Sequence, residues 1–494
     1  MNERTQRLLE LDHAHLWHPF TPMKQWVNQQ VPIIDRAEGE YLIDTEGNRY
    51  IDGVSSLWCN VHGHRVPEID RAIRDQLDKV AHSTLLGLGS PPSIELAAML
   101  ADRAPGGLNK VFYSDAGATA VEIAFKVAVG YWYHRGRPEK SAFIGFGGAY
   151  HGDTVGAMSV GYSDLFHRPF VSMVFKTHWA PSPDPARPRQ PVVDRLNAED
   201  ADGQAECPAC GPGGDCTQAV FPSQCPRLAR ALRDHCLEEL ENLLKTHAEH
   251  TAAIVIEPVM QGAAGMICQP EGFVRGVGEL ARKYDVLLIA DEVATGFGRT
   301  GPLFACEREV DESWHGPDIM ALAKGISGGY LPLAATMFTD EVEGAFRGDL
   351  RERKTFYHGH TYTGNALACA AAIASLELFD RNRVLERVAA NAALIAERLD
   401  ALKACPHVLD VRQRGIMVGI EICRDRDTRE PFDFAKQVGV RLCAAMRPHG
   451  LIVRPLGNVI ILMPIPAMTP ETLSRMLDVV VETINGWKYE DVEA

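Results

Sequence analysis

Between residue 95 and about residue 375, short apolar runs alternate with longer segments of helical periodicity. The apolar runs lie at 110–113, 142–146, 253–257, 286–290 and 334–338. The helical segments lie at 118–135, 271–284 and 366–379. Strands that alternate with helices form βαβ units, in which consecutive strands are parallel. The pattern therefore predicts an α/β fold built on a mostly parallel sheet.

The chain outside this central part has a different pattern. A chain of 494 residues is too long for one small core, so two domains are expected. Residues 1–75 hold a polar helix and a hairpin, and residues 376–494 combine helices with several short strands. Such a mixture is typical of an α+β domain. We predict a large domain over residues 76–375, and a small α+β domain formed by residues 1–75 together with residues 376–494.

Residues 184–226 interrupt the alternation with a segment rich in Pro, Gly, Asp and Arg. This composition predicts an inserted surface loop. The segment contains Cys207, Cys210, Cys216 and Cys225, which are enough ligands for a structural zinc ion. The spacing after the first C-x-x-C is irregular, however, and no second C-x-x-C follows. The sequence favours a flexible insert with thiols and no metal, and zinc is the alternative.

Charge and composition exclude several classes of protein. A net charge of −15 without any basic run argues against a nucleic-acid surface. No stretch approaches the roughly 18 consecutive apolar residues of a membrane span. The first residues are polar and do not resemble a secretory signal, so we expect a cytoplasmic protein whose thiols are reduced.

Small and polar residues follow the predicted strands, at the edge where an open α/β sheet binds ligands. Gly117 and Ala118 lie in a small-residue turn that opens a helix, where backbone N–H groups suit a phosphate. Tyr150 lies in a glycine-rich loop and can stack on a planar ring. Glu257 ends another apolar run, and either orients its neighbours or only terminates the strand.

Two charged residues complete this set. Asp291 follows the apolar run 286–290, and Lys324 lies 33 residues later, before a glycine. A lysine amine can form a Schiff base with an aldehyde cofactor, and an aspartate can hold that cofactor's pyridine nitrogen protonated. The pair therefore predicts a pyridoxal phosphate (PLP) site, with Lys324 and Asp291 as its catalytic residues.

Residues 296–301 match the dinucleotide fingerprint G-x-G-x-x-G by letter. The fingerprint requires a strand directly before it and a helix directly after it. Here residues 291–295 separate it from the apolar run, and Pro302 stands where the helix should continue. We predict that this segment is not a nucleotide site.

The chain resembles the class III (ω-type) aminotransferases of PLP fold type I, over nearly its whole length outside the insert. The segment 288–301, followed by Lys324, carries this resemblance and is specific to that class. Within the class, segments 16–21, 53–58, 150–160 and 358–365 are most similar to members of the biotin pathway that aminate 8-amino-7-oxononanoate. The resemblance implies the same reaction, with adenosylmethionine or lysine as amino donor. The alternatives are another ω-amino acid or diamine aminotransferase, or a PLP aminomutase on the same fold.

The resemblance also implies roles for single residues in cofactor binding. The residues implied are Gly117, Ala118, Tyr150, Asp291, Lys324, His360 and Thr361. Gly117 and Ala118 would give backbone amides to the phosphate, and Tyr150 would stack on the pyridine. His360 and Thr361 would reach the phosphate of the cofactor in a partner subunit. This arrangement implies a homodimer with shared active sites.

A second set of residues is implied in substrate binding. Its members are Phe20, Leu57, Trp58, Tyr150, Gly359 and Arg454. Arg454 would take the substrate carboxylate, for which a guanidinium group is a natural bidentate partner. Many members carry Tyr in place of Phe20, and many adenosylmethionine users carry Trp in place of Leu57. These two differences leave adenosylmethionine and lysine open as donors.

Overall fold

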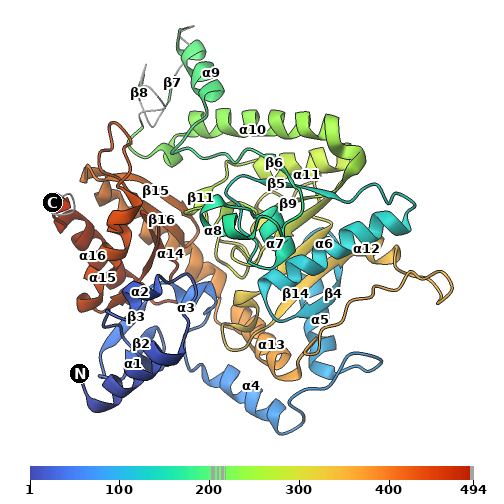
Figure 1. Cartoon of the computed structure of the whole chain (residues 1–494), viewed down its shortest axis with the longest axis horizontal. Helices are drawn as coiled ribbons and strands as arrows, with labels where there is room; N and C mark the ends of the chain where they lie inside the picture. Colours follow the sequence, from blue (N-terminus) through green and yellow to red (C-terminus); the bar gives the residue numbers. More distant parts are fainter. Residues whose placement is uncertain (202–205, 208–210, 213–215, 217–218, 490–494) are drawn as a thin grey trace.

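The structure is a computed structural model that describes residues 1–201, 206–207, 211–212, 216 and 219–489. Its centre is a seven-stranded sheet, part of which is visible among the helices in Figure 1. The strands, in spatial order, are β4 (Leu108–Ser114), β14 (Ala334–Thr339), β13 (Ile319–Leu322), β12 (Leu287–Asp291), β9 (Thr251–Ile256), β5 (Ala142–Phe146) and β6 (His178–Ala180). The five strands from β13 to β6 are parallel, and β14 is antiparallel to both of its neighbours. The predicted mostly parallel sheet is confirmed.

Both faces of this sheet are covered, which explains why its strands read as continuous apolar runs. Side chains of β12 alternate between the faces, as strand geometry requires. Leu287 and Ile289 pack in the cluster that contains α6 (Gly117–His134), whereas Leu288 and Ala290 pack in the cluster that contains α11 (Phe273–Lys283). Every residue of β12 is buried. The side chain that follows this core at the strand's carboxyl end is Asp291.

Two smaller sheets lie beside the central one (Figure 1). The first consists of β1 (Ile34–Glu38), β2 (Tyr41–Asp44), β3 (Arg49–Asp52) and β17 (Leu451–Ile452). The second is antiparallel and consists of β15 (Val408–Arg414), β16 (Met417–Ile422), β19 (Val459–Leu462) and β18 (Arg454–Leu456). The pairing of β3 with β17 joins the two ends of the chain. It supports a small domain formed from both ends, although the boundaries at 75 and 375 stay predictions.

The remaining helices cover these sheets. They are α1 (Glu3–His15), α2 (Met23–Trp26), α4 (Pro67–Leu77), α5 (Pro91–Arg103), α7 (Val155–Val160), α8 (Asp164–His167), α12 (Asp340–Gly344), α13 (Ala366–Arg381), α14 (Val384–Leu399), α15 (Val438–Met446) and α16 (Pro470–Gly486). A short hairpin pairs β10 (Met260–Gln261) with β11 (Ile267–Cys268). In the part of the chain that is described, no helix has both the length and the apolar character needed to cross a bilayer.

The insert, predicted as a surface loop over residues 184–226, is more regular than its composition indicates. It contains α9 (Gln190–Ala201) and a small hairpin of β7 (Glu206–Cys207) and β8 (Gly211–Pro212). Val192 and Leu196 of α9 are buried in one small apolar cluster with residues of α10 (Pro226–His247). Two apolar positions among many polar and Pro residues are too weak a periodic signal to indicate a helix from sequence.

Candidate active site

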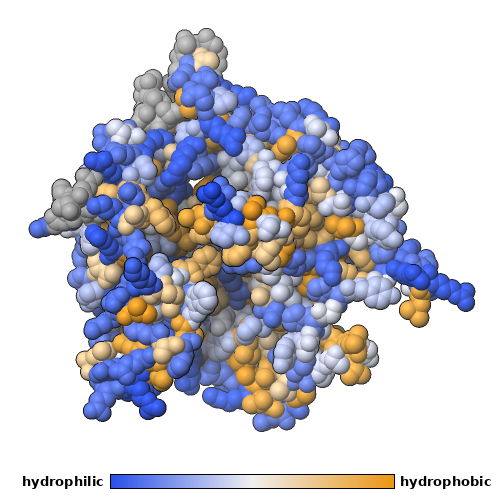
Figure 2. Space-filling view, in the orientation of Figure 1, coloured by the Kyte–Doolittle hydropathy of each residue, from blue (hydrophilic) through white to orange (hydrophobic). Residues whose placement is uncertain are grey.

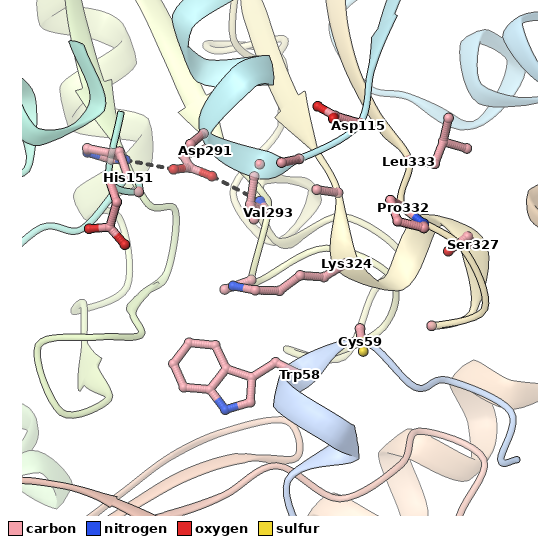
Figure 3. Close-up of a pocket in the computed structure, with 18 of the residues that line it drawn as sticks. Trp58, Cys59, Asp115, His151, Asp291, Val293, Lys324, Ser327, Pro332 and Leu333 are labelled. Atoms are coloured by element: carbon pink, nitrogen blue, oxygen red, sulfur yellow. Dashed lines mark hydrogen bonds and ion pairs between the residues drawn. The ribbon is translucent and has the colours of Figure 1, made fainter. Parts of the chain in front are cut away.

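A cavity of about 510 Å³ opens at the carboxyl edge of the central sheet (Figure 3). Six of the predicted site residues line it: Trp58, Gly117, Ala118, Tyr150, Asp291 and Lys324. They come from five separate segments of the chain, which the parallel strands and their loops bring to one edge. A volume of this size suits a small organic cofactor together with a substrate.

Lys324 follows β13 and starts a short 3-10 turn, Lys324–Ser327. Its backbone φ is +45°, a left-handed conformation that costs a non-glycine residue energy and is often found at functional sites. Burial lowers the pKa of its amine and outweighs the negative charges of Asp291 and Glu257, which act in the opposite direction. The side chain extends between Asp291 and Trp58 in Figure 3, and Nζ lies 4.8 Å from the centroid of the Trp58 ring.

Asp291 is fixed by two hydrogen bonds at the end of β12. Its Oδ2 accepts from Nδ1 of His151 at 2.6 Å, and its Oδ1 accepts from the backbone N–H of Val293 at 3.0 Å. Burial would lower the pKa of His151, but the hydrogen bond and the negative charge of Asp291 outweigh it and raise that pKa. These two hydrogen bonds fix the orientation of the Asp291 carboxylate at the edge of the cavity.

His151 has a role that sequence reasoning missed. It lies in the same glycine-rich loop as Tyr150, but a lone histidine in a loop carries no specific signal. Its Nε2 is buried without a hydrogen-bond partner among the described residues. Glu257 shares this environment: its carboxylate accepts from the N–H groups of Tyr150 and Gly262, and burial raises its pKa to about 7. The sequence left two roles for Glu257, either orienting its neighbours or only ending the strand. These contacts fit the first role, because the Glu257 carboxylate positions the loop that carries Tyr150.

The N-terminus of α6 forms one wall of the cavity, with Gly117 and Ala118 in its first turn. The first backbone N–H groups of a helix have no intrahelical partner and favour an anion. Backbone packing is tight here. A Cβ on Gly117 would lie 2.5 Å from Cγ1 of Val293, and one on Gly152 would lie 2.5 Å from Cβ of Ala118. Glycine at positions 117 and 152 therefore allows the loop, the helix and the strand end to approach one another this closely.

Trp58 is presented by an unusual turn. Ser55, Ser56, Leu57 and Trp58 form α3 (Ser55–Trp58) with positive φ at all four residues. Each non-glycine residue in this conformation costs roughly 1–2 kcal/mol. Hydrogen bonds compensate: Ser56 donates to Asp52 through both its N–H and its hydroxyl. The turn directs Trp58, 7% exposed, into the cavity wall, whereas Leu57 is exposed and does not line the cavity.

The side chain of Arg299 is hydrogen-bonded to this turn and to the residues that follow it. Its guanidinium donates to Oγ of Ser55 at 3.1 Å and to the carbonyl groups of Pro464 and Asn60. Arg299 is fully buried and ties residues 55–60 to the small C-terminal sheet. Residues 296–301 form turns, and in the described chain no α-helix follows them directly.

The other predicted site residues lie outside the cavity lining. Arg454, in β18, is close enough to Tyr150 for its charge to lower the pKa of that phenol, although burial and a hydrogen bond to Asp153 outweigh it and raise the pKa. Phe20 is 61% exposed and packs edge-on against Phe166. Gly359 and Thr361 are exposed, and His360 makes an ion-pair contact with Asp115 at 3.0 Å.

These groups fit PLP. The N-terminus of α6 suits the phosphate, Tyr150 offers a face for the ring, Asp291 suits the pyridine nitrogen, and the amine of Lys324 suits the aldehyde. His151 also lines the cavity, and its Nε2 is a buried polar atom without a hydrogen-bond partner among the described residues.

Comparison with known proteins agrees with this geometry. Residues 23–204 and 214–484 match the family model described as aminotransferase class III. The chain is 48% identical over 481 residues to the adenosylmethionine-8-amino-7-oxononanoate aminotransferase of Geobacter sulfurreducens, covering 97% of this chain and 98% of the relative. It is 43% identical over 484 residues to the protein of that name from Methanocaldococcus jannaschii, covering 98% and 99%.

Solved structures show the same fold. The crystal structure of the Methanocaldococcus jannaschii protein superimposes with a TM-score of 0.85 at 42% identity, covering 97% of this chain and 99% of that chain. An (S)-enantioselective ω-transaminase from Thermomicrobium roseum also gives a TM-score of 0.85, at 32% identity and 99% coverage of both chains. A further neighbour is an amine transaminase described as PLP-bound. The resemblance found in the sequence is confirmed: the chain belongs to the class III aminotransferases, which are PLP-dependent enzymes.

Proposed function

We propose that this aminotransferase transfers an amino group to the ketone of 8-amino-7-oxononanoate, giving 7,8-diaminononanoate for biotin synthesis, with adenosylmethionine as the first candidate donor. One observation carries the proposal. Five relatives that are 43–48% identical over nearly the whole chain are all named for this pair of substrates. The ω-transaminase from Thermomicrobium roseum, at 32% identity, supports a broader ω-amine specificity as the second candidate.

When bound, PLP supplies an aldehyde that joins the substrate amine and a ring that takes up electrons from the broken C–H bond. Asp291 would hold the pyridine nitrogen protonated, and the hydrogen bond from His151 orients Asp291 for this task. The N–H groups of Gly117 and Ala118 would bind the phosphate, and Tyr150 would cover one face of the ring. These contacts orient the reacting carbon toward Lys324.

Lys324 would move the proton. A general base must be neutral before it can accept a proton, and burial of Lys324 favours the neutral amine by lowering its pKa. Its Nζ would take the proton from the donor's α-carbon and return it to the carbon that had carried the aldehyde. The same two transfers in reverse order would aminate the ketone. The ring of Trp58, whose centroid lies 4.8 Å from this amine, would limit the access of water to it.

The proposed substrate site extends from Tyr150 toward Arg454. The oxo acid is an apolar chain with a carboxylate at one end, so it needs aromatic or aliphatic walls and a cation. Trp58 and Tyr150 provide walls, and Phe20, Leu57 and Gly359 are proposed to complete them at the mouth. Adenosylmethionine carries a sulfonium, which gains from aromatic faces such as that of Trp58. Leu57 and Phe20 stand where many adenosylmethionine users carry Trp and Tyr, and they weaken this aromatic environment. Lysine therefore stays the alternative donor.

A half-reaction panel tests the substrates. We expect adenosylmethionine to bleach the visible absorbance of the PLP-loaded enzyme within seconds, and 8-amino-7-oxononanoate to restore it. Stopped-flow absorbance with each candidate donor measures this, with 4-aminobutyrate and putrescine as comparison amines. Rapid bleaching by lysine but not by adenosylmethionine would reverse the order of donors. Failure of 8-amino-7-oxononanoate to restore the absorbance would refute the proposed acceptor.

The same assay examines Arg454. Truncation in Arg454→Ala should leave the substrate carboxylate unpaired and cost about 2–5 kcal/mol in kcat/KM for the oxo acid, or roughly 30- to several-thousand-fold. Arg441, exposed on α15, is the matched control, and Arg441→Ala should retain the wild-type value. Equal values for the two variants would show that the carboxylate binds elsewhere.

The proposal includes a homodimer in which each subunit completes the other's site. Thr361 and Gly359 are exposed and lie outside the cavity of their own chain. Large apolar side chains near them in sequence are also exposed, namely Leu350, Tyr357 and Tyr362. An exposed apolar set of this kind is typical of a protein interface. Thr361 and His360 would then reach the phosphate bound in the partner subunit.

Mixed dimers test this sharing of sites. Lys324→Ala and Thr361→Glu should each be inactive, the second because a carboxylate repels the phosphate. A heterodimer of the two has one site with both intact residues if Thr361 acts in the partner, so about half of wild-type turnover is expected. Tagged co-expression and tandem purification give the heterodimer for steady-state assay. Heterodimers as inactive as both parents would contradict the proposal.

The partners proposed are therefore small molecules and a second copy of the chain. A net charge of −15 disfavours nucleic acid as a partner. We place the enzyme in the cytoplasm, because a chain with twelve cysteines suits a reducing compartment.

A further inference from the structure

Three cysteines of the insert meet in space. The sulfur atoms of Cys207, Cys216 and Cys225 all lie within 4.8 Å of one another. The side chains are buried, at 3%, 1% and 0% exposure. Cys207 and Cys225 are 18 residues apart in sequence, yet their Sγ atoms are 3.5 Å apart. Linear spacing alone could not show this convergence.

The sulfur positions match those of a metal site. Four thiolates at the typical Zn–S distance of about 2.3 Å form a tetrahedron whose edges are about 3.8 Å. In the structure the Sγ atoms of Cys207 and Cys225 are 3.5 Å apart, and no two of the three sulfur atoms are more than 4.8 Å apart. These distances lie on either side of the S–S distance in such a tetrahedron. A disulfide requires an S–S distance of about 2.05 Å, which Cys207 and Cys225 do not approach.

The backbone around the cluster is arranged to stabilise thiolates. Cys225 is the N-cap of α10, and its Sγ accepts from the N–H of Leu228 at 3.5 Å. The guanidinium of Arg227 lies 3.9 Å from Sγ of Cys216. A helix N-terminus and a nearby cation both favour the negative sulfur that binds a metal. Cys207 belongs to the β7–β8 hairpin, in which it is paired with Gly211.

The core formed by the described residues of the insert is small. The cluster that buries the cysteines contains, among the described residues, Val192, Leu196, Cys207, Cys216, Cys225, Leu228, Ala231 and Leu232, with Ala219 packed against it. Small units with so few large apolar side chains usually need a metal or disulfides for stability. We propose that Cys207, Cys216 and Cys225 bind a structural zinc ion that fastens the β7–β8 hairpin and the following segment to the start of α10.

Cys210, three residues after Cys207, lies outside the described residues, so the proposal rests on the other three thiols. The site is structural because of its place in the fold. In Figure 1, α9, β7 and β8 lie at the outer edge of the molecule, beyond α10 and away from the centre of the large sheet. Ser223, which lies between Cys216 and Cys225 in sequence, donates to Asp410 of β15 at 2.8 Å and so connects the segment to the small domain.

Metal analysis of the full-length enzyme tests the proposal. Protein purified without chelator should contain about one zinc per chain by mass spectrometry, and Cys216→Ser should contain less than a tenth of that. Cys236→Ala is the matched control, because Cys236 is buried on α10 outside the cluster, and it should keep its zinc. Replacement by Co²⁺ alone should give the intense absorption of a tetrahedral thiolate site in the wild-type chain and not in Cys216→Ser.

Stability separates the zinc site from the active site. A chelator should lower the melting temperature of the wild-type enzyme by several degrees and leave that of Cys216→Ser unchanged. Amino transfer below the melting temperature should persist in both. Wild-type protein that takes up no zinc from a zinc chloride solution, or holds iron instead, overturns the assignment. Unchanged zinc content in Cys216→Ser does so as well, whatever the substrates of the enzyme prove to be.

Discussion

Replacement of Lys324 by alanine is expected to abolish amino transfer while the protein still binds PLP. The amine is the group that would carry the proton between two carbon atoms, and no other lysine lines the cavity among the described residues. Loss of a general base and covalent anchor together should lower kcat by more than about 1,000-fold. The helix N-terminus at Gly117 and the carboxylate of Asp291 remain, so cofactor affinity should persist.

Steady-state rates and equilibrium titration with PLP measure the two properties separately. Lys110→Ala, at a solvent-accessible position on β4, serves as the control and should keep both at the wild-type level. The spectrum of the Lys324→Ala protein should resemble free PLP, since the covalent link is absent. Retention of more than a trace of turnover would remove Lys324 from the mechanism.

The second large effect is expected at Asp291. Asp291→Asn should fold and bind PLP, yet lose roughly 100- to 10,000-fold in kcat, because a neutral amide cannot hold the pyridine nitrogen in its protonated form. His151 would still have an oxygen to which it can donate, so the local packing should survive. Rates of the donor half-reaction, followed by absorbance, isolate this step from product release.

Asp318→Asn is the matched control. Asp318 is a half-buried carboxylate next to β13 whose Oδ2 accepts from the N–H of Leu288, and it does not line the cavity. Its variant should stay within a few-fold of the wild-type rate and show only a change in stability. Similar losses in the two variants would mean that Asp291 acts through the fold and not through the cofactor.

Much of the site was visible in the sequence because it depends on local pattern. Apolar runs predicted strands at 142–146 and 286–290, and the structure has β5 at Ala142–Phe146 and β12 at Leu287–Asp291. Parallel strands place their carboxyl ends at one edge, so Asp291 and the residues after β13 had to be neighbours. Lys324 and Gly117 could be placed from strand order and loop composition alone.

Contacts between segments distant in sequence could not be predicted. The hydrogen bond of His151 to Asp291 spans 140 residues, and the bond of Arg299 to Ser55 spans 244. Each joins side chains whose own segments carry no periodic or spacing signal for the partner. The helix α9 was missed for a related reason, since its two buried residues are covered by contacts with α10, a separate segment of the chain.

The sequence by itself thus determined the parallel α/β core, the cofactor class and the two residues at the centre of the proposed chemistry, because strand periodicity and strand-end position are local properties. Only the tertiary structure decided how Asp291 is oriented by His151 and how Trp58 is held in a left-handed turn. It also brought Cys207 and Cys225 together across an irregular insert. Those features depend on packing between remote segments, which a linear spacing does not encode.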